Sequence, residues 1–261
     1  MFPILFQTGS YRFSSLGFLV GSGFFVSLFL IWRRLREMGL EEEKIIDVYL
    51  LASLMGAIFS RIFYVLGHPL AFGFDLVKWF HFGRFPGFSF IAGVLIFLIF
   101  FGYFAKKNKW NFYKISDELV FGLTLFLSLA AVGQFLDGSN LGGETGFFWG
   151  VFFPGDLVRR HPVSLFEGVL FLLLWFFLIK IERRWRSWSW YKSKKEGFLL
   201  IVFLGLVFLI KFLLAFLKPA GLYSTWAERI IYGLLVLSAG AWLYYRSGRR
   251  LKKEKKWRKK I

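Results

Sequence analysis

Apolar residues fall into seven long runs, and short linkers between the runs carry most of the charged residues. A helix must stay apolar for about 20 residues to cross the hydrocarbon core of a membrane, which is about 30 Å thick. Each run is close to that length, so the pattern predicts seven transmembrane helices. The runs cover residues 16–32, 45–66, 88–105, 119–138, 163–181, 198–217 and 230–245.

The linkers are all too short to hold a soluble domain, so the pattern predicts one membrane domain over residues 1–246 and a basic tail, 247–261. The first run differs from a cleaved signal peptide, because the charged stretch RRLRE follows it directly and no small-residue cleavage site precedes that stretch. The predicted fold is therefore all-α, as a polytopic membrane protein.

Composition supports the membrane class and narrows the chemistry. The chain is 57% hydrophobic and 22% aromatic, which is too apolar for an ordinary soluble domain. It has no cysteine, which excludes disulfides, thiolate zinc sites and a cysteine nucleophile, so any reacting thiol must belong to a substrate. The three histidines, His68, His81 and His161, lack metal-ligand spacing. We expect no metal and no cofactor.

The net charge of +18 is concentrated in alternate linkers and in the tail. Lysine and arginine are enriched in cytoplasmic loops, so this asymmetry predicts an outside N-terminus and a cytoplasmic C-terminus. The same distribution favours anionic lipid headgroups over nucleic acid as the partner of the basic tail. Solvated charge with no partner explains the tail equally well.

Polar residues inside the apolar runs are the candidate functional residues, because a charge at the bilayer centre costs about 2.5 to 3.5 kcal/mol on insertion scales. Lys211 requires an anion, either a carboxylate such as Asp137 or Glu167, or a lipid phosphate. Local explanations also exist: Arg61 can snorkel to the interface, and an acid near a helix start, such as Glu167, is favoured by the helix dipole. The full set is Arg61, Tyr64, Gln134, Asp137, Asn140, Glu167 and Lys211.

A glycine-rich polar stretch, SNLGGETG, follows the fourth run at residues 139–146. Taken alone, it is typical of a turning loop. Irregular polar backbone at membrane depth is tolerated only against protein or a water-filled cavity. If the stretch turns inward, we therefore expect Gly142 and its neighbours to line a cavity beneath the loop that carries Arg159 and Arg160.

Five stretches together resemble the prolipoprotein diacylglyceryl transferase family. RHPVSLFE is similar to the family's R-H-P-S-Q-L-Y-E, and GAIFSRIFYVL to its G-x-x-x-x-R-x-x-Y-V-L. FLDGSNLGGETGFFWGVFFPG is similar to F-x-N-G-x-x-x-G-x-x-T-x-x-x-W-G-V-x-F-P-G. PGFSFIAGVL follows G-G-M-S-F-H-G-G-L-L, and KFLLAFLKP follows R-F-x-x-E-F-x-R. The matches occur in family order over nearly the whole chain.

The resemblance implies a seven-helix enzyme of the bacterial plasma (inner) membrane. Such an enzyme moves diacylglycerol from phosphatidylglycerol to the lipobox cysteine of a prolipoprotein, so its partners are an anionic phospholipid and a prolipoprotein signal peptide. Glu167, His161 and Asp137 are then the predicted catalytic residues. The predicted lipid-binding residues are Lys211, Arg61, Gln134, Gly142 and Ser139.

The chain departs from the family pattern at several of these positions. The family histidine falls on Ile91, the arginine credited with holding phosphatidylglycerol falls on Ala131, and Lys211 replaces a second arginine. Gln134 stands at an asparagine, and Ser139 and Ala215 stand at glutamates. Two hypotheses therefore stay open: a divergent transferase, and a catalytically inactive relative that binds phospholipid or lipoprotein signal peptides.

Overall fold

A computed structural model describes residues 2–8, 11–73, 75–80, 87–153, 155–219 and 223–248. His81 and residues 249–261 of the predicted tail lie outside the described residues. The chain divides into two compact units, one formed by Met1–Ile31 with Ser116–Ile261 and the other by Trp32–Ile115. Each unit is described by itself.

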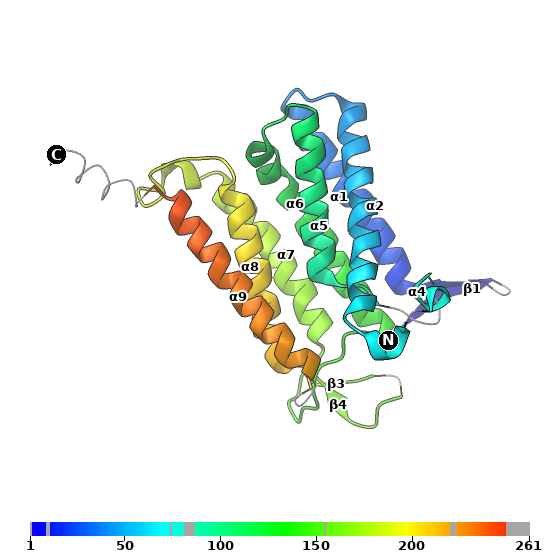
Figure 1. Cartoon of the computed structure of the whole chain (residues 1–261). Helices are drawn as coiled ribbons and strands as arrows, with labels where there is room; N and C mark the ends of the chain where they lie inside the picture. Colours follow the sequence, from blue (N-terminus) through cyan, green and yellow to red (C-terminus); the bar gives the residue numbers. More distant parts are fainter. Residues whose placement is uncertain are drawn as a thin grey trace, which may run out of the picture. The chain divides into compact units, whose positions relative to one another are not determined.

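A long helix covers each of the seven apolar runs, with bounds that differ from the predicted ones by a few residues at most ends (Figure 1). The largest differences are at the starts of α6 and α9, which each begin seven residues before their runs because the sequence ahead of each run is also helical. The seven helices are α1 (Ser15–Glu37), α2 (Glu42–Leu66), α5 (Phe90–Lys107), α6 (Phe112–Asp137), α7 (Val163–Glu182), α8 (Phe198–Leu214) and α9 (Tyr223–Arg246).

Six described helices are long and apolar enough to cross a membrane, which supports a polytopic membrane protein. They are α1, α2, α5, α6, α7 and α8, the last extended to Leu217 by the short helix η2 (Ala215–Leu217). The seventh run also forms a helix, α9, but it is not among the six. The helix α9 is less apolar because it contains three charged residues: Glu228 and Arg229 in its first half, and Arg246 at its end.

The prediction of an all-α fold is incomplete, because the structure also contains two small antiparallel ribbons. In the first, β1 (Ile4–Thr8) pairs with β2 (Tyr11–Ser14), and in the second, β3 (Val151–Phe152) pairs with β4 (Arg159–Arg160). These strands are too short to show a clear alternation in the sequence. Short helices also lie in the linkers: α3 (Pro69–Phe72), α4 (Leu76–Phe80) and η1 (Trp185–Ser187).

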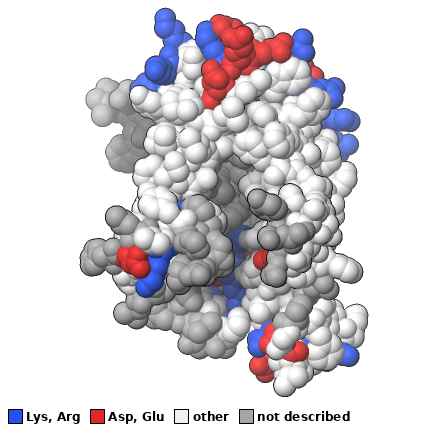
Figure 2. Space-filling view, turned by 90° about the vertical axis from the view of Figure 1, so that its right-hand side faces the viewer, with Lys and Arg blue, Asp and Glu red and all other residues white. Residues whose placement is uncertain are grey.

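Exposed apolar side chains on the long helices indicate that these helices face lipid. Phe25 on α1, Phe176 on α7 and Leu237 on α9 are each more than half exposed. On the face drawn in Figure 2, acidic and basic side chains gather at the upper end and in smaller groups in the lower half, and much of the described surface between them carries neither. An apolar surface of this extent is unusual for a soluble monomer and is expected of a protein in a bilayer.

In the unit Trp32–Ile115, α2 packs along α5. The rings of Tyr49 and Phe97 meet edge to face with centroids 5.8 Å apart, and the Ser60 hydroxyl donates to the Ser89 carbonyl at 2.9 Å. Ser89 also caps α5, because its side chain accepts from the Ala92 amide. These contacts fix the end of α5 against α2.

In the other unit, close packing of α6 and α7 sets the position of the candidate site. A methyl group at Gly168 would lie 2.9 Å from Val132 Cγ2, so only glycine allows this approach. The Ser128 hydroxyl on α6 donates to the Gly168 carbonyl on α7 at 2.8 Å. The first turns of α7 are therefore held directly against α6.

A buried carboxylate on α6 caps the start of α8. Asp117 accepts from the backbone amides of Gly197 at 2.7 Å and Leu200 at 2.9 Å, which lie 80 and 83 residues further along the chain. The first amides of a helix have no partner within the helix, so a carboxylate there satisfies donors that would otherwise be buried alone. Asp117 thus joins α6 to α8.

Removing this cap is expected to destabilise the unit. Asp117→Ala leaves two buried amides without an acceptor, which should lower the free energy of unfolding by about 2 kcal/mol or more. Thermal unfolding of the purified protein in detergent measures the change. The control is Asp47→Asn, which removes an exposed acid from α2 and should leave the transition unchanged. Equal melting temperatures for wild type and Asp117→Ala would show that the cap contributes nothing.

Candidate functional site

A buried ion pair joins α7 to α8. Lys211 Nζ lies 2.7 Å from Glu167 Oε2, and the two side chains are 11% and 2% exposed. The Asn140 side-chain amide donates to the other carboxylate oxygen, Oε1, at 3.5 Å. Of the partners considered from the sequence, Glu167 is therefore the carboxylate that meets Lys211. An isolated buried charge would be strongly unfavourable, so each of these two charges is tolerated because the other lies beside it.

Local sequence explains why Glu167 points into the unit. Pro162 precedes the first turn of α7, a position that suits the fixed φ of proline. The Ser164 hydroxyl donates to the carbonyls of Ser139 at 3.0 Å and Asn140 at 3.3 Å, which ties α7 to the chain leaving α6. Asn140 has a φ of 56°, a left-handed conformation that asparagine tolerates better than most residues.

The SNLGGETG stretch is held by backbone hydrogen bonds on two sides. The Gly142 amide donates to the His161 carbonyl at 3.1 Å, and the His161 amide donates to the Gly143 carbonyl at 3.0 Å. The Gly143 amide donates to the Leu217 carbonyl at the end of α8, at 2.7 Å. Further along, the Thr145 amide pairs with the Arg159 carbonyl. The stretch is therefore a fixed element beside the ion pair rather than a free loop.

Gly142 is required by this close approach. A methyl group there would lie 2.4 Å from the His161 carbonyl oxygen and 2.6 Å from its Cβ. Contacts that short do not occur, so any larger residue must displace the backbone of residue 142 or 161.

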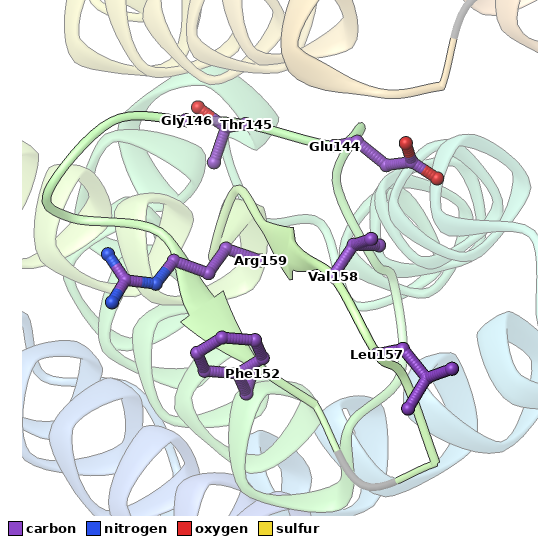
Figure 3. A pocket seen from close by; sticks show the side chains of 7 residues that line it. All are labelled: Glu144, Thr145, Gly146, Phe152, Leu157, Val158 and Arg159. Carbon is purple, nitrogen blue, oxygen red and sulfur yellow. The ribbon is translucent and has the colours of Figure 1, made fainter.

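A cavity of about 510 Å³ lies beside the β3–β4 ribbon (Figure 3). The second half of the glycine-rich stretch and Arg159 line it. Gly142 is not among these lining residues and lies against His161. That Gly142 lines a cavity open to the outer leaflet stays a prediction. The lining residues are Glu144, Thr145, Gly146, Phe152, Leu157, Val158 and Arg159.

The two arginines of β4, Arg159 and Arg160, differ in their partners. The Arg159 guanidinium lies 5.3 Å from the centre of the Phe152 ring. Arg160 forms an ion pair with Asp156 at 2.8 Å and a longer one with Glu144 at 3.7 Å. The hydrogen bond that Arg160 donates to the Asp156 carboxylate raises the pKa of Arg160, so Arg160 remains charged and pairs with acids of the same loop.

The imidazole of His161 is oriented by an indole. Trp149 Nε1 lies 3.4 Å from His161 Nδ1, and the Phe147 ring stacks on Trp149 with centroids 4.5 Å apart. An indole N–H only donates, so Nδ1 must be the acceptor and the proton of the neutral ring is on Nε2. His161 therefore presents a donor, not a base, at its other nitrogen.

The remaining predicted residues lie at the end of α6 or in the other unit. The Gln134 carbonyl accepts from the Ser139 amide at 2.9 Å and from its hydroxyl at 3.3 Å. Asp137 is the last residue of α6 and is partly exposed, and no described cation forms an ion pair with it. Ala131 is buried, so position 131 brings no charge to the site.

Arg61 is buried in the unit Trp32–Ile115, where its guanidinium binds backbone carbonyls. Nε donates to Trp79 at 2.9 Å, Nη1 to Gly87 at 2.8 Å and Nη2 to Lys78 at 3.1 Å. Arg61 is therefore not simply a side chain snorkelling to the interface. Its lipid-binding role stays a prediction.

A second ion pair near the end of α8 was not foreseen from the sequence. Lys218 lies 2.7 Å from Glu228 on α9, and Arg229 donates to the Ala215 carbonyl at 3.2 Å. Position 215 is a glutamate in the family pattern and an alanine here, and the acid that meets Lys218 lies on α9. The sequence feature that could have predicted this ion pair is the adjacent Glu228 and Arg229 in the first half of the last helix.

Comparison with known proteins gives a consistent result. A sequence model described as prolipoprotein diacylglyceryl transferase matches residues 3–246. The chain is 29% identical over 251 residues to the phosphatidylglycerol–prolipoprotein diacylglyceryl transferase of Tolumonas auensis, covering 92% of this chain and 89% of that protein. Proteins of the same name from Clostridioides difficile and Geobacter sulfurreducens are 25% and 28% identical, over 79% and 83% of this chain and 79% and 82% of their own lengths.

Proposed function

Because this chain belongs to the prolipoprotein diacylglyceryl transferase family, we propose that it transfers a diacylglyceryl group from phosphatidylglycerol to the lipobox cysteine of a prolipoprotein. In this reaction the cysteine sulfur forms a bond to the glyceryl carbon, and the bond from that carbon to the phosphate oxygen breaks. Glycerol phosphate leaves, and the thiol proton passes to a base. The chain has no cysteine, in keeping with a thiol supplied by the substrate.

The buried pair of Glu167 and Lys211 is the observation that carries the proposal. An ammonium group has three N–H donors, and Glu167 accepts one of them at 2.7 Å. Lys211 is thereby fixed in place as a point charge for the lipid phosphate, whose negative charge increases as glycerol phosphate leaves. A lysine lacks the planar fork of arginine, so it holds the phosphate with less directional specificity than the family's arginine.

The other site residues take complementary roles. Glu167 accepts a hydrogen bond from the ammonium group of Lys211 at 2.7 Å, so its role is to position Lys211. Asp137, a carboxylate with no ion partner among the described residues, accepts the thiol proton. His161 donates from Nε2 to a phosphate oxygen, since Nδ1 already accepts from Trp149. With Ile91 and Ala131 at the family's histidine and arginine positions, these groups supply the missing functions.

The remaining lipid-binding residues shape the site. Gln134 and Ser139 close the end of α6 and place Asp137 and Asn140, while Gly142 allows the backbone to pass close to His161. Arg61 donates to the carbonyls of Lys78 and Gly87, and its charge makes it the lipid-binding residue of the unit Trp32–Ile115.

We also propose that α9 is a seventh transmembrane helix, and that the protein resides in the bacterial plasma membrane with its N-terminus outside. The charge of the linkers supports this orientation. Reporter fusions at Met1 and at Ile261 should then report opposite sides of the membrane. Both reporters on one side would exclude an odd number of spans.

Complementation tests the activity. Expression of this chain in a bacterium depleted of its own transferase should restore lipoprotein maturation, seen as a mobility shift on a gel. A protein that accumulates in the membrane without restoring maturation would instead be the inactive lipid or signal-peptide binder.

A further inference from the structure

The end of α7 opposite Glu167 carries three cations around a second cavity. Lys180, Arg183 and Arg184 line a cavity of about 260 Å³ together with Phe176 and Ile179. No carboxylate lines this cavity. In the described part of the chain, none of the three cationic side chains has a hydrogen bond or an ion pair. Three unpaired cations beside apolar side chains make an amphipathic surface.

The apolar part of this surface continues along one face of α7. Leu172, Phe176, Ile179 and Arg183 follow one another at intervals of four, three and four residues, which places them on a single helical face. Leu172 and Phe176 are 41% and 56% exposed. This face can therefore hold an acyl chain along its length and a negatively charged group at the Arg183 end.

The segment after α7 places this charged end at the membrane interface. Trp185, Trp188 and Trp190 cluster around Phe198 at the start of α8, with ring centroids 5.1 to 5.9 Å from it. Tryptophan is enriched where hydrocarbon meets headgroups, and basic pockets at the cytoplasmic side of membrane helices bind anionic headgroups. Cations followed by tryptophans are the pattern expected of a helix end in the headgroup layer.

We propose that Lys180, Arg183 and Arg184 form a binding site for one anionic phospholipid, in the leaflet opposite to the site of Glu167 and Lys211. The phosphate contacts the three cations, and one acyl chain lies against Phe176 and Leu172. The lipid at this site does not react, because Lys180 lies 13 residues along α7 from Glu167, which is about 20 Å of helix. Its effect is to fix the carboxyl end of α7 in the headgroup layer.

Native mass spectrometry of the full-length protein in detergent tests this site with two probes, dioleoyl phosphatidic acid and dioleoyl phosphatidylcholine. The wild-type protein should retain phosphatidic acid in preference to phosphatidylcholine. The variant Lys180→Gln/Arg183→Gln/Arg184→Gln should bind one phosphatidic acid on the order of a hundredfold more weakly, since each cation near the surface contributes roughly fivefold. The triple substitution should cause the same loss in a protein that also carries Lys211→Met, because the cation of the reaction site is then absent from both proteins compared.

The matched control is Lys192→Gln/Lys194→Gln/Lys195→Gln, which removes three exposed cations from the same linker without touching the cavity. This control should bind phosphatidic acid as the wild-type protein does. An equal loss in both triple variants would show nonspecific charge attraction and would overturn the site. Equal retention of phosphatidic acid and phosphatidylcholine by the wild-type protein would also overturn the proposed site. This comparison does not depend on the folding of either triple variant.

Discussion

Glu167→Gln should lower transferase activity by about a hundredfold or more and leave the amount of protein in the membrane close to that of the wild type. Glutamine keeps the shape of the side chain and can still meet Asn140, but it removes the charge that holds Lys211 at 2.7 Å. The ammonium group of Lys211 is then no longer held beside the lipid phosphate, whose negative charge increases as glycerol phosphate leaves. A hundredfold loss corresponds to about 2.7 kcal/mol of transition-state stabilisation. Initial rates of lipid transfer, divided by the protein level in the membrane, measure it.

The control for this variant is Glu37→Gln, which removes an exposed acid paired with Arg33 at 3.3 Å. Exposed pairs of this kind contribute little, so both activity and protein level should be unchanged. A fully active Glu167→Gln protein would show that Glu167 only stabilises the start of α7. A variant that fails to accumulate would show that the ion pair is a structural bridge.

Gly142→Ala should reduce activity at least tenfold and lower the thermal stability of the protein. The added methyl group would lie 2.4 Å from the His161 carbonyl oxygen, so the hydrogen bonds between residues 142, 143 and 161 must rearrange. Overpacking of this kind costs about 1 to 3 kcal/mol, and here it also displaces the imidazole and the start of α7. Activity assays and thermal unfolding in detergent measure the two effects.

Gly146→Ala is the matched control, because Gly146 lies in the same stretch and a methyl group there meets no atom within 4 Å. Its activity and melting temperature should equal those of the wild type. If Gly142→Ala and Gly146→Ala behave alike, the contact with His161 does not position the site.

The hydrophobic pattern predicted the long helices because a membrane-spanning helix needs about 20 consecutive apolar residues, and a stretch of that length is visible in the sequence. Six of the seven runs have the length and apolarity of membrane spans. The start of α6 was missed because its polar first turns lie outside the apolar run, where Asp117 serves α8 rather than its own helix. The two ribbons were missed because strands as short as Val151–Phe152 carry no periodic signal.

The site residues that could be predicted from the sequence are those whose charge is unusual in an apolar run. Lys211 and Glu167 stood out as charges in apolar runs, and the structure pairs them. Which carboxylate meets Lys211 was not predictable, because residues 44 positions apart come together only through the packing of α7 and α8. For the same reason, the sequence did not reveal that Gly142 faces His161 or that Trp149 orients the imidazole.

The most direct test of the central claim is transfer by the purified protein in detergent. The substrates are phosphatidylglycerol and a synthetic lipobox peptide, and the peptide mass is followed over time. We predict that the mass increases by one diacylglyceryl group on the cysteine, that glycerol phosphate is released in equal amount, and that a peptide with serine in place of the cysteine is not modified. A folded protein that binds phosphatidylglycerol and leaves the cysteine peptide unchanged would contradict the account.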